Sequence, residues 1–209
     1  MRPETVLAFD TSAAHCAAAL LLPDGRCLTL AEDMARGQAE RLLPMLSELL
    51  AEAGAAWRDL TRIGVGIGPG NFTGIRISVA AARGLALGLG VPAIGVGRFE
   101  ALAHRLPRPL LVVEPGRTGE VWVQRFDIGS EGPLLACDPA EVPRLATDAA
   151  ATGSAAHLTD GPVLAPALPL AEAVARLAAL RAPGARPAPL YLRPADAAPP
   201  SDPPPVILP

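Results

Sequence analysis

The chain opens with three short hydrophobic segments, at residues 6–9, 16–22 and 27–31, each with the length and composition of a β-strand. Between the second and the third lies Pro23-Asp24-Gly25, which is typical of a tight hairpin turn. The pattern therefore predicts an antiparallel three-stranded meander at the start of the fold.

The hydrophobic period then changes from two to about 3.6. It predicts an amphipathic helix that ends before Gly54 and is carried by Leu42, Leu43, Leu46, Leu49 and Leu50. Further along, strands are expected at residues 63–67 and 91–96, on either side of a second helix at 72–89. A strand, helix, strand succession makes a parallel pair with a right-handed crossover. The first sheet should therefore combine parallel and antiparallel pairing.

The second half has a weaker pattern that predicts a smaller α/β unit. A short helix at 99–106 closes the first half, and the expected elements that follow are strands at 110–113, 121–126 and 134–137 and a helix at 170–180. Seven prolines in the last sixteen residues predict a disordered tail. We expect three parts: a first α/β lobe at 1–106, a smaller α/β lobe at 107–193 and the Pro-rich tail at 194–209.

Two polar turns are candidates for one binding site. Asp10-Thr11-Ser12 follows the first strand, and Gly68-Pro69-Gly70-Asn71 joins the fourth strand to the second helix. A glycine-rich turn at a helix start can leave N–H groups unpaired and so bind an anion. The tentative nucleotide-binding residues are therefore Asp10, Thr11, Ser12, Gly68, Gly70 and Asn71. The alternative is that Asp10 caps a turn and the glycines only pack.

The same turns exclude two common nucleotide motifs. Gly64, Gly66, Gly68 and Gly70 alternate, so no GxGxxG results, and no Gly-Lys-Ser/Thr of a P-loop follows them. A polar turn after the first strand, together with a glycine turn at a later strand end, is the arrangement of the actin, sugar-kinase and chaperone ATPase superfamily.

The second helix carries Ala80, Gly84 and Gly88 at intervals of four, hence on one face. Each interior glycine costs roughly 1 kcal/mol relative to alanine, which suggests that a close contact offsets the cost. That contact is either packing inside the domain or a partner helix.

Composition narrows the functional classes. The 209 residues include 18 basic ones, all arginine, against 21 acidic ones, so a catalytic lysine is excluded and the net charge of −3 does not attract nucleic acid in general. Three cysteines and three histidines without metal-site spacing argue against a disulfide framework or a zinc site. With neither a signal peptide nor an apolar run of about 18 residues, we expect a cytoplasmic protein without membrane contact.

Four sequence blocks together resemble the TsaB (YeaZ) family, and they occur in the family's order: Phe9-Asp10-Thr11-Ser12, residues 40–46, residues 68–77 and residues 83–88. The resemblance covers roughly residues 4–105, and Gly119-Glu120-Val121 and residues 190–193 extend it. The chain departs from the family pattern at Gln38-Ala39-Glu40-Arg41, at Asn71 and at Pro115-Gly116-Arg117. Asn71 is a change that a helix N-cap would tolerate.

The resemblance implies two actin/Hsp70/sugar-kinase-like (RNase H-like) α/β lobes, the second reduced, with partner-binding helices in the N-terminal lobe at 1–106. It also implies a non-catalytic accessory subunit that binds TsaD, the enzyme that transfers a threonylcarbamoyl group to the adenosine beside the tRNA anticodon. TsaE would be a further partner, the isolated chain would form a homodimer, and tRNA would be reached only through the complex. No cofactor of the chain's own is implied, and ATP or ADP at the complex interface is left open.

We expect the first two helices to form the partner interface by meeting the corresponding helices of TsaD, or of a second copy, as a four-helix bundle. The residues in question are Leu42, Leu43, Leu46, Ile75, Arg76, Val79, Ala80, Arg83, Gly84, Leu87 and Gly88, with Arg76 and Arg83 serving the assembly. Two other classes of function remain to be weighed: a stand-alone ATPase or kinase of the actin-like superfamily, and a peptidase.

Overall fold

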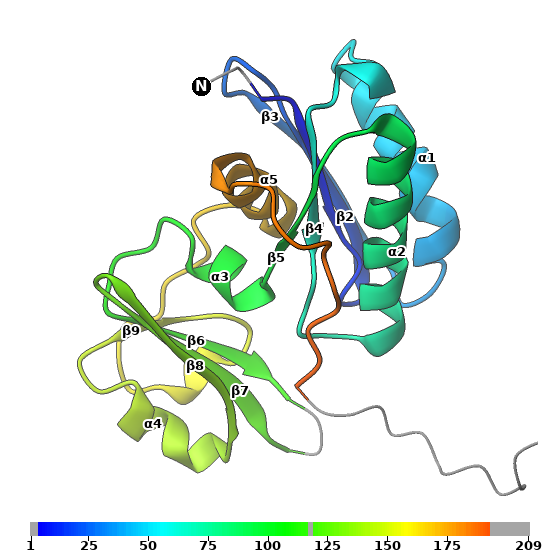
Figure 1. Cartoon of the computed structure of the whole chain (residues 1–209). Coiled ribbons are helices and arrows are strands. Elements are labelled where there is room, and N and C mark those ends of the chain that lie inside the picture. The colour runs from blue at the N-terminus through cyan, green and yellow to red at the C-terminus, as the bar shows by residue number, and fades with distance from the viewer. Residues whose placement is uncertain (1–3, 117–118, 193–209) are drawn as a thin grey trace, which may run out of the picture.

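A computed structural model describes residues 4–116 and 119–192, and contains two β-sheets (Figure 1). The first sheet has the strand order β3-β2-β1-β4-β5. Its strands are β1 (Val6–Asp10), β2 (His15–Leu21), β3 (Cys27–Asp33), β4 (Arg62–Gly66) and β5 (Ala93–Val96). The pair β1/β2 is antiparallel and the pair β1/β4 is parallel, which confirms the predicted mixed sheet.

Helices cover both faces of the first sheet because residues of each strand alternate between the faces. On one face, Leu7 and Phe9 of β1 join the core formed with α1 (Gln38–Glu52) and α2 (Phe72–Leu89). On the other face, Val6 and Ala8 join the core formed with α5 (Leu170–Leu180). We call this sheet with its three helices the first lobe.

The second lobe is a smaller sheet with the strand order β8-β7-β6-β9. Its elements are β6 (Leu110–Pro115), β7 (Val121–Asp127), β8 (Ser130–Cys137), β9 (Ala150–Thr152) and α4 (Val142–Leu145). Short 3₁₀ turns lie at Trp57–Asp59, Pro139–Glu141 and Ala156–Leu158. The hydrophobic pattern missed α4 and β9, which span four and three residues and are too short for periodicity to show.

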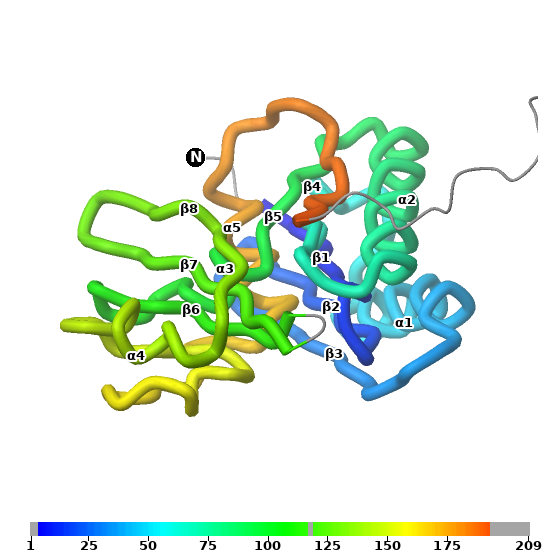
Figure 2. Tube along the Cα trace, turned by 90° about the horizontal axis from the view of Figure 1, so that it is seen from below, coloured from blue at the N-terminus to red at the C-terminus, as the bar shows by residue number. Residues whose placement is uncertain are grey.

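The short helix α3 (Arg98–Ala103) lies between the two sheets and packs on both. Phe99 and Leu102 join the core of the second sheet, whereas Ala101 joins the core that α5 forms with the first sheet. Figure 2 shows α3 at the junction between the lobes. It therefore helps to hold the two lobes together, as does Leu170 of α5, which packs on the same core.

Helix α5 packs on the first sheet, although its place in the sequence suggested the smaller second unit. It contacts β1, β4 and β2, with Val174 and Ala178 beside Gly64 of β4. The alanine-rich face of α5 and the glycine in β4 permit this close approach. The expected boundaries at residues 106 and 193 stay predictions, and the expected tail lies outside the described residues.

Helix α2 is the one described helix that is long and apolar enough to cross a membrane, judged by length and composition alone, with a mean hydropathy of 1.3. Arg76 and Arg83 interrupt its apolar sequence. One face of the helix, with Ile75, Val79 and Ala82, belongs to the core against the first sheet. The apolar residues on this face of α2 therefore serve the core of the first lobe. The opposite face of the helix points outward.

Helix α1 provides a matched test of its packing. Leu46 is fully buried, whereas Leu43, less than one turn away, is 49% exposed. Leu46→Ala should lower the free energy of unfolding by about 2–5 kcal/mol because it leaves a cavity. Leu43→Ala should change it by no more than about 0.5 kcal/mol. Urea unfolding of both variants measures the difference, and equal losses would contradict the assigned face of α1.

Candidate functional site

A cleft of about 1220 Å³ lies between the two lobes. Its walls on the first lobe are the turn after β1, the turn before α2 and the segment before α1; on the second lobe they include Glu114, Trp122 and Ser154. Because β1 and β4 are parallel neighbours, the polar turns that follow them meet at one edge of the sheet. The structure therefore brings the six tentative nucleotide-binding residues together.

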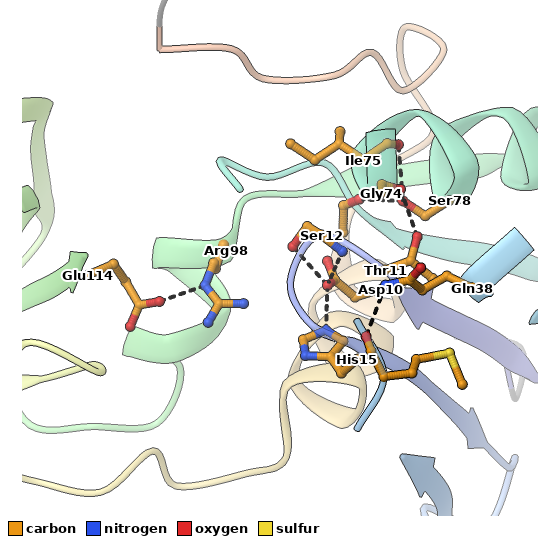
Figure 3. Close-up of polar contacts among 12 residues, drawn as sticks. Asp10, Thr11, Ser12, His15, Gln38, Gly74, Ile75, Ser78, Arg98 and Glu114 are labelled. Atoms are coloured by element: carbon orange, nitrogen blue, oxygen red, sulfur yellow. Dashed lines mark hydrogen bonds and ion pairs between the residues drawn. The ribbon is translucent and has the colours of Figure 1, made fainter. Parts of the chain in front are cut away.

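Asp10, at the end of β1, is buried, and its Oδ1 is bonded within the first lobe (Figure 3). Its Oδ1 accepts hydrogen bonds from the backbone N–H of Ser12 at 2.9 Å and from the Ser12 hydroxyl at 2.8 Å, and lies 2.8 Å from Nε2 of His15. Burial raises the pKa of Asp10, but the hydrogen bond and charge of His15, the bond from Ser12 and the charge of Arg98 outweigh it. The net effect is a pKa below that of an ordinary aspartate.

Hydrogen bonds also join the turn after β1 to the segment at the start of α2. The Thr11 hydroxyl donates to the carbonyl oxygen of Gly74 at 2.7 Å, and the N–H of Asn71 donates to the carbonyl oxygen of Ser12 at 2.6 Å. Asn71 caps α2 by accepting from the N–H of Gly74 at 2.9 Å, as its N-cap position predicted. The expectation that the turn's N–H groups are unpaired is therefore wrong for Asn71.

The glycines of this turn are required by the approach of two backbones. A side chain at Gly70 would collide with the carbonyl group of Ser12, and one at Gly74 would collide with that of Thr11. Gly68 has a φ of 93°, in the left-handed region that glycine tolerates. The packing alternative thus accounts for these positions without a ligand.

Arg98 and Glu114 connect the lobes at the cleft, and sequence reasoning missed both. Nε of Arg98 lies 2.8 Å from Oε2 of Glu114, whose Oε1 accepts from the N–H of Ser154 at 2.7 Å. In Figure 3, Arg98 lies between Glu114 and the group around Asp10. Arg98 directly follows β5 and Gly97, at the edge where the other parallel strands end. That position was the available sequence signal.

The chemistry of the site is limited by these contacts. Both His15 and the Ser12 hydroxyl bond to Oδ1 of Asp10, so the carboxylate lies between them. A nucleophilic serine needs a histidine bonded directly to its hydroxyl to take up the proton, and His15 is not in that position. Within residues 4–116 and 119–192, no three histidine, cysteine or acidic side chains gather as metal ligands would. These contacts hold the turn after β1 in place at the floor of the cleft.

The expected partner-interface residues divide into two groups by burial. Leu42, Leu46, Ile75 and Val79 are at most 3% exposed and belong to the core, so they cannot present a surface, and the expectation fails for these four. The other seven face outward: Leu43, Arg76, Ala80, Arg83, Gly84, Leu87 and Gly88. We call these seven residues the outer face; Leu87 is 82% exposed.

Comparisons with known proteins agree on the family and the fold. The family model described as "TsaD: tRNA N6-adenosine threonylcarbamoyltransferase" matches residues 30–140. The chain is 34% identical over 132 residues to the tRNA threonylcarbamoyladenosine biosynthesis protein TsaB of Escherichia coli, covering 61% of this chain and 57% of that protein. It spans about half the length of the curated relatives that it matches.

Two solved structures are also similar. YeaZ from Pseudomonas aeruginosa has a TM-score of 0.72 at 31% identity and covers 90% of this chain and all of that one. The ethanolamine utilization protein EutJ of Carboxydothermus hydrogenoformans has a TM-score of 0.54 at 12% identity, covering 86% and 90%, which is a likeness of fold alone. These likenesses confirm the expected two-lobed, actin-like α/β fold.

Asp10 gives a prediction for acid stability. Because its folded-state pKa is lowered, the unfolded chain takes up the proton first, and the stabilising contribution is lost as pH falls below about 4. Asp10→Asn should flatten this loss and cost about 1–3 kcal/mol at neutral pH, since buried partners lose a charged acceptor. Urea unfolding between about pH 3 and pH 7 measures both effects.

Asp24→Asn is the matched control, because Asp24 pairs with Arg26 on the surface with half of its side chain exposed. Its pH profile should stay close to that of the wild type. If the Asp10 and Asp24 variants show the same profile, the buried hydrogen bonds of Asp10 do not govern acid stability.

Proposed function

Because this chain belongs to the TsaB (YeaZ) family, we propose that it is a non-catalytic accessory subunit in tRNA threonylcarbamoyladenosine synthesis. In this role it binds TsaD and supports transfer of the threonylcarbamoyl group to the adenosine beside the anticodon. TsaE is a further partner, tRNA is contacted only through the complex, and the chain acts in the cytoplasm.

The observation that carries the accessory role is that Asp10 Oδ1 and the hydroxyl groups of Thr11 and Ser12 are bonded within the first lobe. Asp10 accepts from Ser12 and His15, and Thr11 donates to Gly74, so these side chains serve the fold. An ATPase or kinase of this fold would need the turn to hold phosphate or its metal ion. Binding of ATP or ADP at an interface with the partner stays a prediction.

The outer face supports a protein partner. In the part of the chain that the structure describes, no atom outside the helix backbone lies within 4 Å of where a side chain at Gly84 or Gly88 would begin. The two glycines therefore have no packing role inside the lobe that offsets their cost to the helix. Another backbone can approach them closely, beside the exposed Leu87.

TsaD is the partner that the comparisons favour. The TsaD family model matches residues 30–140, which include α1 and α2. A TsaD protein is therefore expected to have a corresponding pair of helices, and two such pairs can pack as a four-helix bundle. The same geometry allows a homodimer of this chain when TsaD is absent.

Reconstitution tests the accessory role. The purified chain alone should neither hydrolyse ATP nor modify tRNA, and adding TsaD, TsaE and threonylcarbamoyl adenylate should produce modified tRNA over many turnovers. The measurement is the amount of modified adenosine per TsaD with and without this chain. Full multiple-turnover activity of TsaD without the chain would contradict the proposal, and so would steady ATP hydrolysis by the chain alone.

Gly84→Leu tests the outer face. The variant should stay folded, because leucine is the better helix former and the position is open. It should bind TsaD at least about tenfold more weakly and lose the homodimer, because the added side chain holds the helices apart. Ala136→Leu, which adds the same side chain at an exposed position of β8, should bind like the wild type.

Circular dichroism and sedimentation distinguish the outcomes of this test. Wild-type affinity of a folded Gly84→Leu chain would place the interface elsewhere. An unfolded variant would mean that Gly84 packs inside the domain.

A further inference from the structure

The segment at residues 187–192, which we call the strap, follows α5 and runs past the end of β4 toward the start of α2 (Figures 1 and 2). It belongs to no strand or helix. The N–H of Leu190 donates to the carbonyl oxygen of Ile67 at 2.8 Å, and Pro187 is buried beside Gly95 of β5. The strap is thus anchored to the first lobe at two points.

Two arginines of the outer face hold the strap from the other side. Nε of Arg83 donates to the carbonyl oxygen of Pro187 at 2.7 Å, and Nε of Arg76 donates to the Tyr191 hydroxyl at 2.9 Å. The Arg76 guanidinium also lies 3.8 Å above the ring of Phe72, whose centre is 4.9 Å from that of Tyr191. Hydrogen bonds from a charged donor are stronger than those between neutral groups, and the face of an aromatic ring attracts a guanidinium. These contacts join α2 and the strap into one unit.

This unit leaves large side chains exposed next to Arg76 of the outer face, at the rim of the cleft that they also line. Leu190 and Tyr191 are each 38% exposed, although the strap is bonded on both sides. An exposed tyrosine held in place is well suited to an interface, because it offers a large contact area and loses little conformational freedom on binding.

We propose that the strap is a third element of the TsaD-binding surface, in which Leu190 and Tyr191 contact the partner and Arg76 and Arg83 are positioning residues. This inference rests on the proposed function and extends its interface from the two helices to the carboxyl-terminal segment.

The fixed position of the Tyr191 side chain favours a role in partner binding over a strap that only covers the edge of the first lobe. Covering the edge needs the buried Pro187 and the backbone bond of Leu190, and neither requires Arg76 or the aromatic pair of Phe72 and Tyr191. The contacts of Arg76 and Tyr191 order a side chain at the surface. Ordering a surface side chain in advance lowers the entropic cost of binding a partner.

The experiment measures the affinity of the full-length chain for TsaD by calorimetry, with melting temperature as the check on folding. Tyr191→Ala should weaken binding about tenfold or more, as expected for an aromatic anchor. Tyr191→Phe keeps the ring but loses the hydroxyl acceptor of Arg76, and should weaken it by a smaller factor. Ile128→Ala, which removes an 86% exposed side chain from the distant β7–β8 hairpin, should have no effect.

A double-mutant cycle separates positioning from mere structural support. Arg83→Met should weaken TsaD binding in the wild-type chain but have little further effect when Tyr191 is already alanine, because its role is to hold the strap. Arg58→Met, at an exposed arginine for which the structure records no polar partner among the described residues, is the matched control.

The strap proposal is overturned if Tyr191→Ala, Tyr191→Phe and Arg83→Met all bind TsaD like the wild type while Gly84→Leu does not; the two-helix interface then stands alone. If Gly84→Leu also binds like the wild type, the proposed interface itself is wrong. Should Tyr191→Ala fail to fold, the Tyr191→Phe and Arg83→Met chains still decide the question.

Discussion

The close contact of two backbone turns governs this structure. The turn before α2 lies against the turn after β1, with the N–H of Asn71 bonded to the carbonyl oxygen of Ser12 and the Thr11 hydroxyl bonded to that of Gly74. Side chains at Gly70 or Gly74 would prevent it. Because the contact fixes where α2 begins and how it lies on the sheet, it also decides which residues of α2 are buried and which face outward.

That orientation links the cleft to the outer face. Helix α2 starts at the floor of the cleft, buries Ile75 and Val79 in the core, and turns Gly84 and Leu87 to the outside. The strap lies along the same helix, and its last residues also line the cleft. A partner that binds the outer face would therefore act on an element whose first turn belongs to the cleft.

The second lobe is held to the first by a polar contact as well as by the apolar packing of α3. Arg98 and Glu114 form an ion pair in which Glu114 is 5% exposed, and Ser154 supplies a further hydrogen bond to the same carboxylate. A buried ion pair adds little net stability because desolvation opposes it, but removing one partner is costly. The pair therefore adds a specific polar contact between the lobes to the apolar packing of α3.

The sequence by itself determined the elements whose periodicity is strong. The bounds of α2 at 72–89 and of α5 at 170–180, the mixed first sheet and the N-cap at Asn71 all followed from local pattern, because spacing and capping are properties of neighbouring residues. Only the tertiary structure decided that α5 covers the first sheet, that Leu46 is buried while Leu43 is exposed, and that Asp10 is bonded to His15. It also placed Arg98 against Glu114 and Arg83 against Pro187, which is 104 residues away along the chain. Contacts of that separation depend on how the whole chain packs, and a local pattern carries no record of them.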